Sequence, residues 1–304
     1  MSNRIFYASH SVSVSGVVVQ GATSVSLATN FSLEKMYQLG HISVYDQIVN
    51  APEVEVTIAK ALDGYPTIFS MCGGATTLVG SSNQSPTLIL AIGNDTDAQV
   101  GASEGGASIQ MTGCFLKSVK YDMQVEGAFT EECSFVGGSK TIESAGGAPA
   151  SSGAKVLNRR NFSMSGSTLP AEVTGKNLQS VSISADLGRE AMYKLGQYTP
   201  FFRSIQFPLE ITCEIAVIAT THDGVEIETA TNEGCVAVAN SVPSGQQITI
   251  SLCSATGAGL EKYKFDLGNQ CTLQSVNYSG GDTGGGNVTI TYSYTTANTL
   301  TITG

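Results

Sequence analysis

The chain has 304 residues, of which 41% are hydrophobic and 13% are charged, about half the charged fraction of roughly 25% in an ordinary soluble domain. Its length favours two domains over one, and its supply of apolar residues argues against an intrinsically disordered chain. The net charge of -10 and the lack of a basic run argue against binding nucleic acid by phosphate neutralisation.

Apolar and polar residues alternate along most of the first half, and this period of two predicts β-strands. In chain order the alternating positions are Val12 and Val14, Val17 and Val19, Val25 and Leu27, then Val54, Val56 and Ile58 after Pro52, and Leu88 and Leu90. The exception is the window 31–39, where Leu33, Met36 and Tyr37 recur at three- and four-residue spacing before Gly40. This spacing predicts a short helix that ends at the glycine.

The second half shows the same alternation. In chain order the positions are Leu209, Ile211, Cys213 and Ile215 after Pro208, then Val236 and Val238, Ile248, Ile250 and Leu252, and Val288, Ile290, Tyr292 and Tyr294. A second helical window, 187–195, precedes Gly196. We therefore predict a mainly β chain with two tandem antiparallel β-sandwich or barrel domains, each with one short helix.

The two halves resemble each other in sequence. Residues 24–40, SVSLATNFSLEKMYQLG, align with residues 180–196, SVSISADLGREAMYKLG, at a constant offset of 156. The offset also relates four pairs of structural positions, Tyr37 and Tyr193, Leu39 and Leu195, Gly40 and Gly196, and Pro52 and Pro208. A later segment matches Cys114 to Cys271 and Tyr121 to Tyr278 at an offset of 157. Matches in the same order predict a tandem duplication.

The join between the copies is also readable. Residues 137–154, GGSKTIESAGGAPASSGA, are small, polar and rich in glycine, which is typical of a linker. We therefore place the first domain at residues 1–142, the linker at 143–156 and the second domain at 157–304.

Seven cysteines, an odd number, form no C-x-x-C pair. We expect buried free thiols, with later disulfide formation in an oxidising medium left open. No apolar stretch approaches the roughly 18 residues of a membrane span, and no apolar signal segment follows Met1. We expect a protein that stays in the cytosol until it assembles.

No pattern predicts catalysis. The histidines, which have no match in the other copy, are His10, His41 and His222. Motifs of zinc proteases, serine hydrolases and cysteine–histidine enzymes are absent from the sequence. We expect no catalytic residue, no cofactor and no metal site, and we expect His41 to be solvated.

Carboxylates cluster at two places, Glu53 with Glu55 on one face of a strand and Glu131 with Glu132. Paired carboxylates can act as acid and base or hold a metal ion. The second copy does not keep the strand pair, because Glu210 and Glu214 are four residues apart. An acidic row on a solvated surface is therefore the preferred interpretation.

Residues 36–66 contain, in order, Gln-Leu-Gly, an aromatic residue, a Pro-acidic-Val-Glu-Val-Thr strand and Leu-Asp-Gly-Tyr-Pro. This order of motifs resembles a pattern of bacteriophage tail tube proteins. The matching residues are Gln38, Leu39, Gly40, Tyr45, Pro52, Glu53, Val54, Glu55, Val56, Thr57, Leu62, Asp63, Gly64, Tyr65 and Pro66. The second copy keeps Leu195, Gly196, Phe201 and Pro208. It lacks the Val-Glu-Val-Thr and Tyr-Pro motifs, so the resemblance is close over about a tenth of the chain.

The resemblance implies a β-sandwich or barrel subunit that lends strands to a shared ring, with rings stacked into a hollow tube. Such rings are mostly sixfold, so a duplicated chain is expected to build one from three copies. The expected partners are further copies of the chain and other tail proteins, such as a sheath, baseplate or terminator. DNA is expected to pass the acidic lumen without specific binding, since like charges repel. The expected location is the virion tail, assembled in the host cytoplasm.

Two alternatives stay open. Another virion ring protein, such as a baseplate, distal tail or tail-completion protein, would share the fold and the assembly into a ring. A carbohydrate-binding β-sandwich of the adhesin type belongs to a different class and needs exposed aromatic side chains. The chain has no Trp, and we expect its repeat-matched Tyr and Phe residues to be buried.

Overall fold

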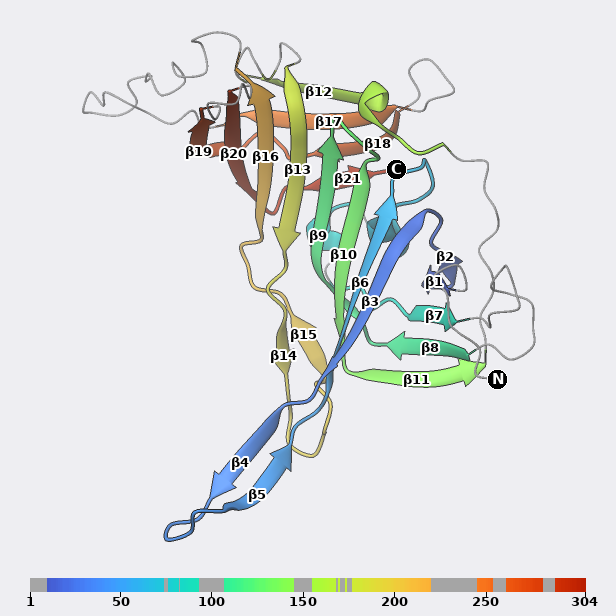
Figure 1. Cartoon of the computed structure of the whole chain (residues 1–304), viewed down its shortest axis with the longest axis vertical. Coiled ribbons are helices and arrows are strands. Elements are labelled where there is room, and N and C mark those ends of the chain that lie inside the picture. Colours follow the sequence, from blue (N-terminus) through green and yellow to red (C-terminus); the bar gives the residue numbers. More distant parts are fainter. Residues whose placement is uncertain are drawn as a thin grey trace.

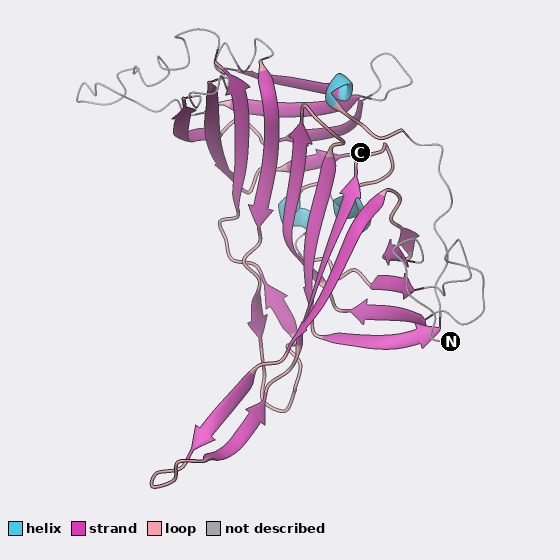
Figure 2. Cartoon of the chain, in the orientation of Figure 1, coloured by secondary structure: helices cyan, strands magenta, loops and turns pink. Residues whose placement is uncertain are grey.

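The computed structural model describes residues 10–73, 76–81, 83–92, 107–144, 155–167, 169, 173, 177–219, 245–253, 261–280 and 288–304. Strands predominate, and every pairing between the described strands is antiparallel (Figure 2). The prediction of a mainly β chain is therefore confirmed.

An eight-stranded sheet forms the centre of the molecule (Figure 1). Its strands from the first half are β3 (Ala22–Asn30), β6 (Glu53–Ala61), β9 (Phe115–Gln124) and β10 (Thr130–Gly137). Its strands from the second half are β13 (Leu178–Asp186), β16 (Glu210–Ile218), β19 (Thr272–Ser279) and β20 (Thr289–Ala297). The order is β19-β20-β16-β13-β9-β10-β6-β3, so the two halves meet where β9 pairs with β13.

Two smaller sheets run crosswise to the central strands (Figure 1). One is β11 (Ser139–Ser144), β8 (Ala107–Thr112), β7 (Leu88–Ile92), β1 (His10–Val14) and β2 (Val17–Val18), in that order. The other is β12 (Phe162–Ser167), β17 (Gln247–Cys253), β18 (Glu261–Asp266) and β21 (Thr301–Thr303). Each of these smaller sheets comes from one half of the chain.

The inward side chains of these sheets meet in one hydrophobic core. In β6 the alternate residues Val54, Val56 and Ile58 are buried, because successive side chains of a strand point to opposite faces. Full burial of such a side chain contributes about 1.5–3 kcal/mol. The alternating sequence that predicted this strand therefore also supplies its core face.

The two predicted helices are wrong. Residues 31–39 and 187–195 instead contribute strands to two hairpins that project from the body. The hairpin strands are β4 (Leu33–Tyr37), β5 (Val44–Val49), β14 (Glu190–Met192) and β15 (Phe202–Ser204). Both faces of the first hairpin are exposed, so no period-two burial shapes its sequence. Pairing with a strand further along the chain overrides the local helical spacing.

The glycines that suggested helix ends lie in the turns of these hairpins. The φ angle is 85° at both Gly40 and Gly196, a conformation that other residues rarely adopt. In the first hairpin His41 donates its backbone N–H to the carbonyl of Gln38 at 3.2 Å. This geometry is that of a β-turn with glycine at its third position.

The described helical segments are short and lie elsewhere. They are α1 (Ile68–Met71), α2 (Leu78–Ser81) and the 3₁₀ segment Arg159–Asn161. No helix among the described residues is long and apolar enough to cross a lipid bilayer. Residues 145–154 of the predicted linker and the predicted strand at Val236 and Val238 lie outside the described residues, so the domain boundaries stay a prediction.

Candidate assembly surfaces

The seam between the two halves is a regular antiparallel strand pair. Its register runs from Ser180 opposite Gln124 to Asp186 opposite Ser118. The inward side chains along it are all buried and comprise Val119, Tyr121, Met123, Val181, Ile183 and Ala185. The seam is thus part of the core, and the two halves form one continuous sheet.

Each half contributes its four strands to the central sheet in the same order, β3-β6-β10-β9 and β13-β16-β20-β19. At the offset of 156 residues β13 is the counterpart of β3, and at 157 residues β19 is the counterpart of β9. The seam therefore joins one edge of the first half to the opposite edge of the second half. Such a head-to-tail contact is heterologous.

The two outer edges of the central sheet are β3 and β19. Among the described strands, β3 pairs only with β6 and β19 only with β20. Tyr278 on β19 is 60% exposed, whereas its counterpart Tyr121 at the seam is 0% exposed. The open edge β19 thus exposes an aromatic side chain whose counterpart is buried at the seam.

The outward face of the central sheet is polar and carries mainly Ser, Thr, Ala and acidic side chains. Its acidic residues, all half-buried or exposed, are Glu53, Glu55, Asp122, Glu132, Asp186, Glu210 and Glu214. Its lysines are Lys117 and Lys120. The predicted acidic row around Glu53 and Glu55 therefore belongs to a wider acidic surface that spans both halves.

Three of these carboxylates have cationic partners. Lys117 Nζ lies 2.6 Å from Glu55, Lys120 Nζ lies 2.7 Å from Asp122, and an arginine from β15 lies 2.6 Å from Glu53. The hydrogen bond to Glu55 raises the pKa of Lys117. The other four carboxylates have no ion pair within the described part of the chain, so the face keeps an excess of negative charge.

The two hairpins, called here the first arm (residues 31–50) and the second arm (residues 190–204), extend from the same end of the central sheet (Figure 1). Their tip leucines, Leu39 and Leu195, are 101% and 104% exposed. The other exposed apolar residues on them are Phe31, Leu33, Met36, Tyr37, Ile42, Val44, Tyr45, Ile48, Val49, Met192, Tyr193, Tyr198 and Phe201. A concentration of exposed apolar side chains is typical of a surface that contacts another protein or a membrane.

The expected burial of the repeat-matched aromatic residues is therefore wrong at Tyr37, Tyr193 and Phe201, which lie on the arms, and at Tyr278 on β19, whereas Tyr121 is buried as expected. Sequence reasoning missed the arms because it took their apolar residues for core. Pro52 and Pro208 lie just before β6 and β16, where each arm returns to the sheet. A useful signal was present, because apolar residues occur on both alternations between Leu33 and Val49.

The second arm contacts the first half of the chain close to the base of the first arm. Arg203 Nη1 contacts Glu53 at 2.6 Å, and Tyr198 Oη donates to the Asn50 carbonyl at 2.8 Å. Arg189, just before the arm, donates Nε to the Leu116 carbonyl at 2.8 Å. Burial, with the nearby Arg203 charge, lowers the pKa of Arg189 to about 10. The arm therefore reinforces the seam between the halves.

A buried polar cluster lies inside the first half. The Glu131 carboxylate accepts hydrogen bonds from the backbone N–H of Ile68 at 2.7 Å and of Phe69 at 3.1 Å, and from Tyr121 Oη at 2.8 Å. Burial raises the pKa of Glu131, although these bonds oppose the shift. The prediction of a solvated Glu131 is wrong, whereas Glu132 is exposed as expected. These hydrogen bonds anchor α1. The carboxylate is sealed from solvent, so it is out of reach of a dissolved substrate.

The Leu-Asp-Gly-Tyr-Pro segment lies beside this cluster and contacts the second half. Lys60 Nζ, fully buried, lies 3.2 Å from Asp63 and donates to the Pro66 carbonyl at 3.1 Å. Tyr263 on β18 accepts from the Gly64 N–H at 2.8 Å and donates to the Tyr65 carbonyl. These residues tie the halves together.

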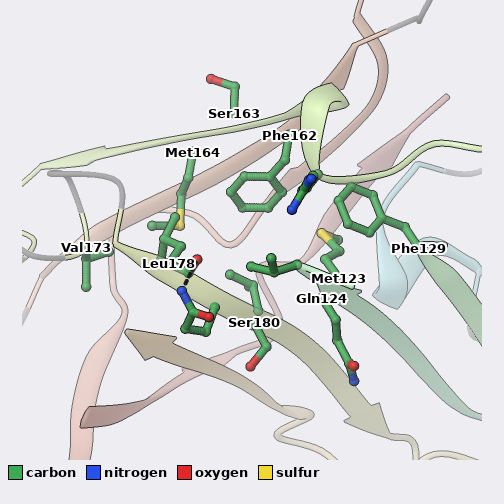
Figure 3. A pocket seen from close by; sticks show the side chains of 13 residues that line it. Met123, Gln124, Phe129, Phe162, Ser163, Met164, Val173, Leu178 and Ser180 are labelled. Atoms are coloured by element: carbon green, nitrogen blue, oxygen red, sulfur yellow. Dashed lines mark hydrogen bonds between the residues drawn. The ribbon is translucent and has the colours of Figure 1, made fainter. Parts of the chain in front are cut away.

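A cavity of about 440 Å³ opens at the end of the seam away from the arms (Figure 3). Its walls are polar and apolar in about equal parts, and the apolar side chains include Met123 and Phe129 from the first half and Phe162, Met164 and Leu178 from the second. The polar side chains that line it are Gln124, Arg159, Ser163, Gln179 and Ser180. Among the described residues this lining offers no carboxylate, histidine or thiol for acid–base or nucleophilic chemistry.

The remaining sequence candidates are scattered. His41 is exposed at the tip of the first arm, His10 is half-buried in β1, and His222 lies outside the described residues. No group of three metal-ligating side chains occurs within the described ranges.

The cysteines confirmed as buried free thiols are Cys72, Cys114, Cys133, Cys213 and Cys271. Cys253 is a free thiol that is half-buried. Cys235 lies outside the described residues.

Comparison with known proteins yields no family. No protein-family model matches the chain, and no curated protein is significantly similar to it in sequence.

Proposed function

We propose that the chain is a structural protein of a virus particle, a bacteriophage tail tube subunit that polymerises as stacked rings into a hollow tube. The observation that carries the proposal is the head-to-tail seam, which leaves two different open edges on one sheet. A repeated heterologous contact closes into a ring when its rotation allows, and otherwise gives a filament. Three chains with two similar halves each would form a pseudo-sixfold ring.

The polar face of the central sheet supports a role as the wall of a channel. It is lined by hydroxyl side chains and by more carboxylates than lysines, including Glu132, Glu210 and Glu214. Phosphate groups are repelled by such a surface, so DNA would pass along it without specific binding. The chain acts in this proposal through its shape and charge, with no catalytic residue.

The arms support stacking between rings. Both extend from the same end of the central sheet (Figure 1) and expose a leucine at the tip. Such surface is stabilised when another protein covers it. The partner is a neighbouring ring, or another tail protein at the end of the tube. The proposed location is the virion tail, assembled in the host cytoplasm.

The test is the assembly state of the purified chain. Size-exclusion chromatography with light scattering at rising concentration should show association, and electron microscopy should show rings or tubes with a central hole. Substituting Leu39 and Leu195 together by serine should leave rings and shorten tubes, while the control Val17→Ser, at an exposed position on β2, should change neither. A chain that stays monomeric at every concentration would overturn the proposal.

Two other candidates have a specific observation in their favour. A baseplate, distal tail or tail-completion protein would use the same edges but stop at a single ring, so microscopy would show discs and no tubes. The exposed aromatic residues of the arms, such as Tyr45 and Tyr198, suit an adhesin that stacks sugars on them. That adhesin would bind a glycan array as a monomer.

A further inference from the structure

The seam gives a template for a contact between separate chains. At the seam Ala185 lies opposite Val119, Ser184 opposite Lys120 and Ile183 opposite Tyr121. The two strands of this pair, β9 and β13, have their counterparts in the open edges β19 and β3. The same chemistry of edge pairing is thus shown once within the chain and is available a second time at its outer edges.

The counterparts agree in fine detail. β3 has an irregularity between Ala22 and Ser24 in its pairing with β6, and β13 has one between Leu178 and Ser180 in its pairing with β16. The first pair of residues maps onto the second at the offset of 156. A β-bulge bends its strand and sets the local twist. The open edge strand β3 and its counterpart at the seam, β13, therefore share one backbone shape.

The other edge shows the same agreement. The pairing of β9 with β10 shifts between Leu116 and Ser118, and the pairing of β19 with β20 shifts between Leu273 and Ser275. These positions correspond at the offset of 157. The register of the seam can therefore be transferred residue by residue.

We propose that β3 of one chain pairs antiparallel with β19 of a second copy in the register of the seam. This inference rests on the proposed function and names the contact that would join the subunits. The transferred pairs are Asn30 with Ser275, Thr29 with Val276, Ala28 with Asn277, Leu27 with Tyr278 and Ser26 with Ser279. One chain cannot make this pairing with itself, because its two edges are separated by the full width of the eight-stranded sheet.

The composition of the two edges favours this pairing. Neither β3, ATSVSLATN, nor β19, TLQSVNYS, contains a charged residue or a proline. Soluble proteins usually protect long edge strands with lysine, proline or a covering element. Neither strand contains lysine or proline, and no described strand pairs with its outer side, although the strands are 9 and 8 residues long. They are therefore suited to being covered by another strand.

The pairing also accounts for the exposed apolar side chains at the edges. Leu27 is half-buried and Tyr278 is 60% exposed. Their counterparts at the seam, Ile183 and Tyr121, lie opposite each other and are both 0% exposed. A second chain in the transferred register would bury Leu27 and Tyr278 against each other. Because the polar faces of both sheets then lie on the same side, the acidic surface continues from chain to chain.

The test is disulfide cross-linking in the full chain. Ala28→Cys with Asn277→Cys places two thiols opposite each other on the polar face. The control is Ser24→Cys with Asn277→Cys, which is out of register by four residues, or about 14 Å at 3.4 Å per residue, too far for a disulfide. Lys120→Cys with Ser184→Cys is the positive control, since these residues pair within one chain.

Under mild oxidation the in-register variant should give covalent multimers on a non-reducing gel, at least about tenfold more than the out-of-register variant or the unmodified chain. The positive control should give a link within single chains. Equal cross-linking by both test variants would overturn the register. So would rings in the microscope without in-register cross-links, an outcome that leaves the tube function standing. In-register dimers that never form rings or tubes would support the pairing and overturn the tube function.

Discussion

Glutamine in place of Glu131 tests the buried cluster that anchors α1. The carboxylate accepts from Ile68 N through one oxygen and from Phe69 N and Tyr121 Oη through the other. Glutamine keeps one oxygen and places an NH₂ group against a backbone N–H. One buried donor is then left without an acceptor, which costs about 1–3 kcal/mol of unfolding free energy.

The pH dependence gives a sharper test of the same residue. Burial raises the folded-state pKa of Glu131 above its ordinary value of 4.5, so the protonated form favours folding. Its contribution to stability is fully present below the unfolded-state pKa and is lost as pH rises through the folded-state pKa. Glutamine does not titrate. The stability deficit of Glu131→Gln should therefore be largest at acidic pH and should shrink as pH rises.

The assay is urea unfolding of dilute protein at several pH values between about 5 and 8. Tyrosine fluorescence can report it, since the chain has 11 Tyr and no Trp. The matched control is Glu132→Gln at the adjacent position, where the side chain faces solvent. Its unfolding free energy should change by no more than about 0.5 kcal/mol. A deficit for Glu131→Gln that grows with pH would refute the reasoning, because it would mean that the folded state prefers the charged carboxylate.

Three further predictions concern packing and the ties between the halves. Tyr263→Phe removes the acceptor of the Gly64 N–H and should cost about 1–3 kcal/mol in urea unfolding, whereas Tyr278→Phe at the exposed edge should cost little in the monomer. Ile58→Ala should cost about 2–5 kcal/mol because Ile58 is fully buried; a loss below about 1 kcal/mol would show that the core there is loosely packed. Burial raises the pKa of the thiols most sealed in the core, so in native protein they should react with iodoacetamide far more slowly than after unfolding, as mass spectrometry can measure; these are Cys72, Cys133 and Cys213.

Period-two alternation predicted the body of the protein well. The strand after Pro52 and the strand at Ile248 appear as β6 and β17, because half-buried strands need one apolar face. The arms escaped prediction for the same reason. Their strands lie outside the core and have no buried face, so the spacing of their apolar residues carried no signal of secondary structure.

The assembly surfaces divide in a similar way. The acidic row at Glu53 and Glu55 was readable from sequence, since alternate residues of a strand share a face. The seam was not, because pairing of β9 with β13 joins residues about 60 positions apart and no local pattern encodes a non-local partner. The buried position of Glu131 was hidden for the same reason: its partners at Ile68 and Phe69 lie 63 and 62 residues away in the chain.

The two arms are unequal, since β4 and β5 have 5 and 6 residues whereas β14 and β15 have 3 each. Translation of both halves as one polypeptide makes long and short arms in strictly equal numbers and fixes their alternation around any closed assembly. Two such assemblies placed face to face would match in only every other rotational setting. In such an assembly the difference in length between the two hairpins would restrict the angles at which neighbouring rings can stack.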